Sequence, residues 1–265
     1  MKTSGRRWSR HEPAMPWNWD AASVRRQWRL LHRGDAEPCP QDVGVLAAWA
    51  HFHNGRFHRA AELGLKAWEA GNPAGLTVAH KATAVHANYV ERSEALRLDL
   101  LLDVARSAEE QVAADPDNIS ALYWQAYALG RYSQGISVAK ALAQGMGKRV
   151  MTALDSVIRS RPRHADAHFA LGIFHAEVID KVGVLIARLT YGARKDEGLE
   201  HFSEGLRLNP GAIMGRVEYA LGLTMFQGDQ AEAQAQSLLR EAANAEPHDA
   251  LDELEIAQAR AALND

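Results

Sequence analysis

Two stretches decide the fold of this chain: AHFALGIFH at residues 167–175 and GLEHFSEGLRLNP at residues 198–210. In both, apolar or small residues recur every three or four positions, which is the spacing of one face of an α-helix. Gly172 and Gly205 lack a Cβ atom, so two helix backbones can approach each other closely at these positions. Phe202 is large enough to fill the space beside them. We therefore expect two helices that pack tightly on each other.

The end of the second stretch carries a stop signal that recurs along the chain. A proline supplies no amide hydrogen and crowds the preceding turn, so it ends a helix. The spacings between the five prolines that follow helical segments are 43, 46, 48 and 37 residues: Pro73, Pro116, Pro162, Pro210 and Pro247. We expect four helices that end before these prolines, at 94–114, 147–160, 197–208 and 231–245. Residues 43–70 are expected to form two further helices with a break at 53–56. Helix, turn, helix and proline in repetition indicate an α-solenoid.

The repeated pattern resembles the tetratricopeptide repeat (TPR) superfamily. Leu171 and Gly172 match the large and small pair of its first helix, and Phe202, Gly205 and Pro210 match its second helix. The resemblance covers residues 41–263. It implies an all-α fold, a TPR-like α-α superhelix (a right-handed α-solenoid) of about five helix pairs. We expect an N-terminal basic, Trp-rich segment over 1–40, with a cap helix at 20–33, followed by a repeat domain over 41–265.

Two repeats are longer than the pattern allows. Residues 132–148 and 178–195 are surplus segments between paired helices, the second about fourteen residues beyond a repeat of roughly 34. Long inserts in folds with short loops are often functional. Enlarged repeats of this kind are similar to those of the TRAP-transporter T-component, which handles ligands, and of the regulator-of-microtubule-dynamics group, which are scaffolds. The apolar stretch 189–193 is expected to fold over a groove as a lid.

The composition is that of an ordinary globular protein. The chain has 265 residues, a formal net charge of -3 and 47% hydrophobic residues, which excludes a disordered chain. The single cysteine, Cys39, excludes an intrachain disulfide and a multi-thiolate zinc site. The longest apolar run, 182–187, is far shorter than a membrane span, and no secretory signal peptide is evident. We expect a cytoplasmic protein with no membrane span.

The charges are unevenly distributed between the two ends. Residues 1–33 contain eight basic and two acidic residues, whereas residues 229–265 contain two basic and nine acidic ones. The basic end could bind an anionic partner such as RNA, with tryptophans available for stacking: Trp8, Trp17, Trp19 and Trp28. The alternative is a polar cap whose tryptophans pack on the first helix pair, as a repeat array requires. We favour the cap and regard nucleic acid as an improbable partner.

Residues capable of catalysis or metal binding form no convincing site. His164, His168 and His175 have the spacing of one helical stripe and could hold Zn²⁺, but the last two occupy aromatic core positions of a TPR helix. Cys39 lies between two prolines, and the sequence contains no nucleophile elbow, phosphate loop or dinucleotide fingerprint. We therefore expect a protein that is not an enzyme, with no metal and no cofactor.

The expected function is recognition by the inner wall of the array. With the prolines as register marks, the first helices should line an apolar concave groove with ten residues: Trp49, Phe52, Tyr123, Tyr127, Arg131, Phe169, Ile173, Glu177, Val217 and Leu221. Such a groove suits a protein or peptide segment. The function expected is thus a non-catalytic TPR-type scaffold with a protein or peptide partner. The alternative is a T-component-like binding protein for a hydrophobic small molecule.

Overall fold

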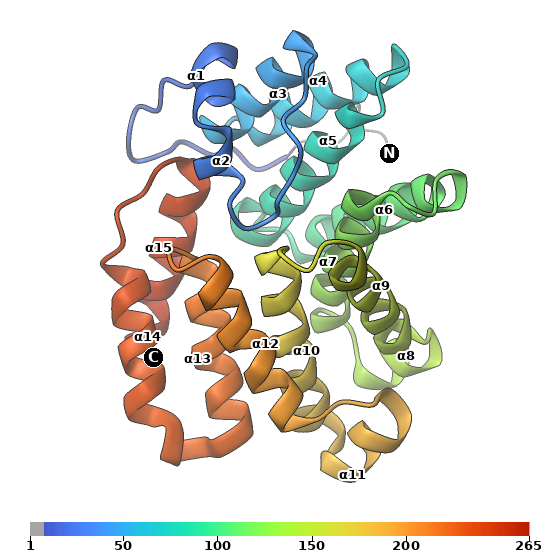
Figure 1. Ribbon diagram of the computed structural model, residues 1–265, viewed down its shortest axis with the longest axis vertical. Helices are drawn as coiled ribbons and strands as arrows, with labels where there is room; N and C mark the ends of the chain where they lie inside the picture. Colours follow the sequence, from blue (N-terminus) through green and yellow to red (C-terminus); the bar gives the residue numbers. More distant parts are fainter. Residues whose placement is uncertain (1–7, 265) are drawn as a thin grey trace. The chain divides into compact units, whose positions relative to one another are not determined.

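The structure, a computed structural model, describes residues 8–264 and divides into two compact units (Figure 1). Unit 1 comprises the N-terminal residues up to 32, residues 37–136 and residues 248–253. Unit 2 comprises residues 33–36, residues 137–247 and the residues from 254 onward. Within the described residues every regular element is helical, which confirms the predicted all-α class. The predicted boundary after residue 40 stays a prediction.

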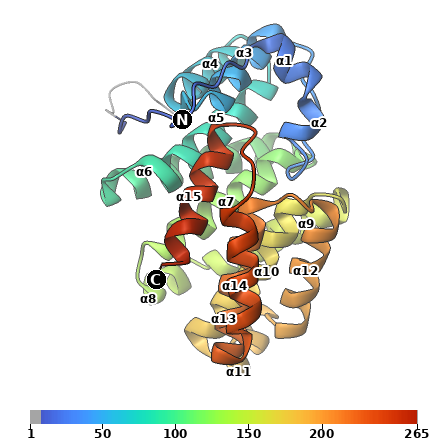
Figure 2. The ribbon, with the colours of Figure 1, turned by 90° about the vertical axis from the view of Figure 1, so that its left-hand side faces the viewer.

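Unit 1 is built from consecutive helices joined by short turns. Its elements are α1 (Ala21–Arg26), α2 (Trp28–Leu31), α3 (Val43–His53), α4 (Phe57–Glu69), α5 (Ala74–Val85), the π-helical turn η1 (His86–Val90), α6 (Glu94–Ala114) and α7 (Ile119–Gln134). Helix α4 packs along both α3 and α5, and α6 packs along α7. Figures 1 and 2 both show α3 and α4 side by side.

The helix boundaries of unit 1 follow from local sequence signals. The side chains of Asp42, Ser93 and Asn118 each accept a hydrogen bond from a first-turn amide and so begin α3, α6 and α7. The predicted break between α3 and α4 occurs at Gly55, whose φ of +74° is accessible to glycine at little cost. The predicted helix over 94–114 coincides with α6. The predicted helix over 20–33 is instead two short helices, because the backbone at Gln27 leaves the helical conformation.

The N-terminal segment is attached to the body of unit 1. The indole of Trp8 packs on His86 with ring centroids 4.4 Å apart, and Trp17 Nε1 donates to Glu253 Oε1 at 3.0 Å. Trp19 and Asn54 exchange two hydrogen bonds of 2.9 and 2.8 Å. These contacts attach the segment to η1, to α15 (Ala250–Ala262) and to the turn that follows α3. Trp8 is buried, so its ring is not available for stacking on a nucleobase.

Unit 2 contains the two longest inserts. Its elements are α8 (Val138–Ala143), α9 (Met146–Ser160), α10 (Ala165–Val182), α11 (Val184–Ile186), the π-helical turn η2 (Ala187–Tyr191), α12 (Lys195–Leu208), α13 (Ile213–Gln227), the 3-10 turn η3 (Gly228–Ala231) and α14 (Glu232–Ala243). Helix α15 (Ala250–Ala262) begins in unit 1 and continues in unit 2. Figures 1 and 2 both show α13 and α14 side by side.

The centre of unit 2 is the close helix packing that the sequence predicts. Phe202 is fully buried, and its ring stacks on Tyr219 with centroids 4.8 Å apart. A Cβ atom placed on Gly172 would lie 2.8 Å from this ring, and one on Gly222 would lie 2.5 Å from it. The ring of Phe169 occupies the corresponding space against Gly205. Both rings can therefore reach their places only because glycines face them.

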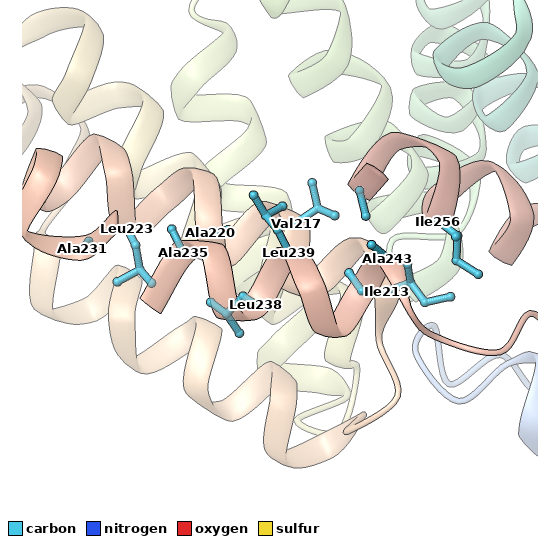
Figure 3. Packing of buried hydrophobic residues seen from close by; sticks show 12 residues of the cluster. Ile213, Val217, Ala220, Leu223, Ala231, Ala235, Leu238, Leu239, Ala243 and Ile256 are labelled. Atoms are coloured by element: carbon cyan, nitrogen blue, oxygen red, sulfur yellow. The ribbon is translucent and has the colours of Figure 1, made fainter. Parts of the chain in front are cut away.

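A second apolar layer joins α13 to α14. Leucine, isoleucine, valine and alanine side chains from both helices interdigitate, as Figure 3 shows, and Ile256 of α15 packs on the same layer. Glu255 accepts a hydrogen bond from the amide of Met214 at 3.1 Å, at the beginning of α13. Among residues 8–264, no helix is both long and apolar enough to cross a membrane.

Candidate functional site

Unit 1 contains a cleft lined mainly by cationic side chains. It lies between α1, α2 and the segment that follows them, and its volume is about 590 Å³. Eight residues line it: Arg25, Arg26, Gln27, Trp28, Arg29, Leu30, Glu37 and Cys39. Three of the eight carry a guanidinium group and one carries a carboxylate.

The short helix α1 is fixed by a capping box. Asp20 Oδ1 accepts a hydrogen bond from the amide of Ser23 at 2.7 Å, and Ser23 Oγ accepts one from the amide of Asp20 at 2.9 Å. The hydrogen bonds from Ser23 lower the pKa of Asp20 below its usual value. This start places Arg25 and Arg26 in the last turn of α1, where cations complement the helix dipole.

Trp28 supports the floor of the cleft. Its buried ring stacks on His32 with centroids 3.8 Å apart and meets Trp49 edge-on at 5.7 Å. Trp28 Nε1 donates to the carbonyl oxygen of Glu37 at 2.7 Å, which fixes the opposite wall. The carboxylate of Glu37 accepts a hydrogen bond from the hydroxyl of Ser120 on α7. The cleft wall is thus held from α2, α3 and α7.

The arginines give the cleft its electrostatic character. Arg25, Arg26 and Arg29 are exposed, and Arg25 Nη2 donates to the carbonyl oxygen of Gln41 at 2.9 Å. Guanidinium groups bind carboxylates and phosphates through two parallel hydrogen bonds. Three guanidinium groups against the one carboxylate of Glu37 leave the lining with an excess of positive charge, which favours an anionic ligand.

The sequence pattern identifies these residues only as members of a basic end. The residue types alone show three cations and one aromatic ring, and they do not show that these side chains form the walls of one cleft: Arg25, Arg26, Arg29 and Trp28. Cys39, which was assigned to a linker, is half-buried in the lining. Neither the spacing nor the residue types of this segment show that 37–39 folds back against α2.

The predicted groove residues of unit 1 belong largely to its core. Trp49 and Phe52 are buried, and each makes ring contacts with His53. Tyr123 is also buried. Tyr127 is half-buried, and the guanidinium of Arg131 lies over its ring at 5.4 Å.

The predicted groove residues of unit 2 divide in the same way. Phe169 and Val217 are buried, the first against Gly205 and the second in the layer between α13 and α14. Ile173 and Glu177 are half-buried, and Leu221 is exposed.

The burial of these side chains limits what a groove can offer. Five of the ten side chains are buried, and a partner could contact them only if the helices around them separated: Trp49, Phe52, Tyr123, Phe169 and Val217. Helix neighbours cover these five side chains in the structure, and their part in a groove stays a prediction. A partner-binding role for the others stays a prediction: Tyr127, Arg131, Ile173, Glu177 and Leu221. Within the expected lid, 189–193, Leu189 is 77% exposed, whereas Ala193 is buried in a cluster with Ile179; its role as a lid stays a prediction.

The histidines proposed as metal ligands have other partners. His164 precedes α10 and caps it, with Nδ1 accepting from the amide of Ala167 at 3.1 Å, so it does not join the helical stripe. His168 Nδ1 is 3.0 Å from Nδ1 of His201, and the ring of His175 stacks on that of His201 at 6.0 Å. His175 Nδ1 accepts from the amide of Arg194 at 3.1 Å.

The pKa values of the three clustered histidines of unit 2, His168, His175 and His201, are all lowered. Burial, followed by repulsion from the neighbouring imidazole, lowers the pKa of both His175 and His201 to about 4. Burial also lowers the pKa of His168. In the part of the chain that the structure describes, no group of three or more histidine, cysteine or carboxylate side chains is arranged to hold a metal ion.

Unit 1 contains a buried pair of titratable side chains that the sequence pattern does not predict. His53 Nδ1 lies 2.6 Å from Asp249 Oδ2, and both side chains are almost fully buried. Burial alone would raise the pKa of Asp249, but the hydrogen bond and charge of His53 lower it below its usual value. Lys81 Nζ lies nearby, over the rings of Trp49 and Phe52 at 5.7 and 5.4 Å. The two residues are 196 positions apart in the sequence, so no local pattern predicts this pair.

The comparisons with known proteins bear on the fold. No protein-family model and no curated protein sequence matches the chain. A solved structure does: a thermophilic TPR protein from Thermus thermophilus superposes with a TM-score of 0.58 at 17% sequence identity. The match covers 82% of this chain and 97% of that one.

The chain has a TPR-like fold. The specific likeness to the T-component and to the microtubule-dynamics regulators stays a prediction. At 17% identity the likeness concerns the backbone arrangement alone. Within this fold, glycines make room for the rings of Phe169 and Phe202 in unit 2.

Proposed function

We propose that this protein is a non-catalytic scaffold that binds an acidic segment of a partner protein in the arginine-lined cleft of unit 1. TPR-like helical repeats generally serve as protein-binding surfaces, which supports the class of function. The cleft supports the location and the chemistry, because it combines three guanidinium groups with a volume of about 590 Å³. Ligand pockets of several hundred Å³ accommodate a few side chains of a peptide.

The observation that carries this proposal is the pairing of exposed arginines with a rigid floor. Arg26 and Arg29 are exposed on α1 and α2, while Trp28 between them is anchored to His32, Trp49 and Glu37. A fixed backbone reduces the entropy lost when the guanidinium groups engage a ligand. An extended peptide with aspartate or glutamate side chains offers carboxylates for two-point hydrogen bonds.

The apolar groove remains a second surface for the same function. Its accessible members stay a prediction, and Tyr127 with Arg131 offers an aromatic and cationic pair in unit 1. The alternative of a hydrophobic small-molecule ligand receives less support, because Tyr123 and Phe169 are packed within the core. A cytoplasmic location, too, stays a prediction.

The test uses peptides selected on the full chain. Short random peptides displayed on phage are enriched on the protein, and the enriched sequences are synthesised with a fluorophore. We expect enrichment in aspartate and glutamate, and we expect binding to weaken as salt is added. The variant Arg26→Gln/Arg29→Gln should weaken peptide binding by about tenfold or more, because both charge-assisted contacts are lost.

The matched control removes exposed cations elsewhere in unit 1. Lys66→Gln/Arg106→Gln changes the same net charge on α4 and α6 and should leave peptide binding unchanged. Equal affinity of the cleft variant and the wild type for the selected peptides would refute the proposal. Displacement of the peptides by single-stranded RNA, with no enrichment of acidic sequences, would assign the cleft to nucleic acid instead.

A further inference from the structure

The insert between α10 and α12 exposes a block of aliphatic side chains. Four neighbouring residues on α11 and η2 have exposed fractions of 54–77%: Val184, Leu185, Ile186 and Leu189. Figure 1 shows α11 beyond the ends of α10 and α12. Single exposed aliphatic residues are common on protein surfaces, but a contiguous group of this size marks an interaction site.

The other insert of unit 2 also exposes aliphatic side chains. Helix α8 exposes Val138 and Leu142 at 42% and 46%. The two inserts touch, because a Cβ on Gly147 would lie 2.8 Å from the ring of Tyr191. Helix α9 also packs against η2. We call the two segments, 137–149 and 181–195, the insert edge of unit 2.

The insert edge is a structured element. Ala187 and Ala193 are buried against Ile179, and the amide of Ala193 donates to the carbonyl of Ala187 at 3.2 Å. Gly183 and Gly192, at φ values of +79° and +69°, allow the chain to reverse at both ends of this turn. The small side chains thus anchor the turn, while the large aliphatic ones face solvent.

The charges of the insert edge are of one sign. Residues 134–154 contain three basic residues and no acidic one, and residues 181–195 contain four basic residues and no acidic one. The whole chain, by contrast, carries 33 acidic and 30 basic residues. At the base of the insert two of the cations have carboxylate partners, Lys181 with Glu177 at 3.4 Å and Arg194 with Glu197 at 2.8 Å.

Three other cations of the two inserts are exposed. Lys148, Arg188 and Lys195 are exposed, and Arg188 lies between Ile186 and Leu189 in the sequence. A surface that combines protruding aliphatic side chains with cations complements a surface that is apolar beneath a layer of negative charge. An anionic lipid bilayer has this arrangement, with phosphates above acyl chains.

We propose that the insert edge docks this protein on an anionic lipid bilayer, with the α11 and η2 aliphatic side chains entering the boundary between head groups and acyl chains. Lys148, Arg188 and Lys195 then contact the lipid phosphates. This is peripheral attachment, and it goes beyond the binding of a partner protein in the unit 1 cleft. The two contributions have separate signatures, because the aliphatic one persists in salt and the electrostatic one is screened.

The experiment is flotation of the full chain with vesicles of phosphatidylcholine alone and with added phosphatidylglycerol. We expect binding to increase with the phosphatidylglycerol fraction and to fall as salt is added. Leu185→Ser/Leu189→Ser should reduce the partition coefficient about tenfold or more, because the apolar area that enters the bilayer is lost. Arg188→Glu/Lys195→Glu should reduce it at least about fivefold per cation.

Matched controls change equally exposed residues of unit 1. Val43→Ser/Trp68→Ser removes apolar side chains that are 67% and 47% exposed, and Lys66→Glu/Arg106→Glu reverses two exposed cations. Both controls should float as the wild type does. Circular dichroism spectra that match the wild type establish that each variant is folded.

Three outcomes would overturn the proposal. The first is a wild-type chain that does not bind phosphatidylglycerol vesicles, and the second is an insert variant that binds them as well as its control does. The third is concentration-dependent dimerisation that the Leu185→Ser/Leu189→Ser variant abolishes, without vesicle binding by the wild type. This last result would assign the insert edge to a second copy of the chain.

Discussion

Replacement of Asp249 by alanine should destabilise unit 1 strongly. Asp249 Oδ2 pairs with His53 of α3, whereas Oδ1 accepts hydrogen bonds from the amides of Leu251 and Asp252, both at 2.9 Å. One carboxylate therefore ties α3 to the beginning of α15 and also caps α15. The substitution removes both contributions and leaves His53 buried opposite an apolar group.

The magnitude follows from these two roles. Loss of a helix N-cap costs about 1 kcal/mol, and removal of one partner of a buried ion pair costs about 3–5 kcal/mol. The two losses overlap in one side chain, so we expect Asp249→Ala to lower the free energy of unfolding of unit 1 by about 3–5 kcal/mol. Asp249→Asn keeps an oxygen for the cap and a polar contact to His53, and should cost about 1–2 kcal/mol.

Tryptophan fluorescence during urea unfolding measures this effect selectively. All seven tryptophans of the chain lie in unit 1 at positions 8, 17, 19, 28, 49, 68 and 124, so their emission reports on that unit. Circular dichroism reports on the helices of both units. The alanine variant should shift the fluorescence midpoint more than the asparagine variant does. A shift no larger than that of an exposed substitution, such as Lys66→Ala, would refute the role assigned to the pair.

The pH dependence gives an independent check. The pKa of Asp249 is lowered in the folded state, so the folded chain binds fewer protons than the unfolded chain at acidic pH. Its stabilising contribution is fully present above the unfolded pKa of about 4 and is lost as the pH falls through the lowered folded value. The difference between wild type and Asp249→Ala should therefore shrink as the pH falls below about 4.

Two further predictions concern unit 2 and its glycine and histidine packing. Gly172→Ala should destabilise unit 2 by about 1–3 kcal/mol, because the new Cβ would overlap the ring of Phe202. Gly130 has open space around it, so Gly130→Ala should be neutral or stabilising by about 0.5–1 kcal/mol. Urea unfolding followed by circular dichroism measures both variants. Because the pKa of His175 and His201 is about 4 when folded and near 6.5 when unfolded, stability should fall as the pH drops below 6.5, by up to about 1.4 kcal/mol per pH unit for each histidine. His201→Gln should make the free energy of unfolding less dependent on pH below 6.5. A variant whose stability depends on pH as the wild type's does would contradict the role assigned to His201.

The sequence predicted the helix boundaries well because they depend on neighbouring residues. The serine at position 93 and the aspartate at 115 bracket α6, and a glycine at 55 divides α3 from α4. The same holds for the close approach around Phe202, whose facing glycines form part of the repeat pattern. Caps, turns and i, i+4 spacings act within a few residues, so they can be read from one chain.

The candidate site was harder to predict because it depends on contacts between distant segments. Helical spacing identified Trp49 and Phe52 as apolar but did not show which helices cover them. The pair of His53 with Asp249, and the hydrogen bond of Trp28 to Glu37, join positions that no periodicity relates. An apolar stripe on a repeat helix indicates that this face is buried. The stripe does not show whether another part of the same chain or a partner protein covers that face.

The two inserts show why an excess of residues can be more informative than a motif. Close packing around Phe202 leaves no interior space for additional residues between α10 and α12, so the surplus must project outward. An outward loop with no binding role would be expected to carry polar and acidic residues, as the remainder of this acidic chain does. Segment 181–195 carries exposed aliphatic side chains and only basic charges. Exposure of these aliphatic side chains to water is unfavourable, whereas their contact with an apolar surface that bears negative charge is favourable. Vesicle binding therefore tests directly the role proposed for the insert edge of unit 2.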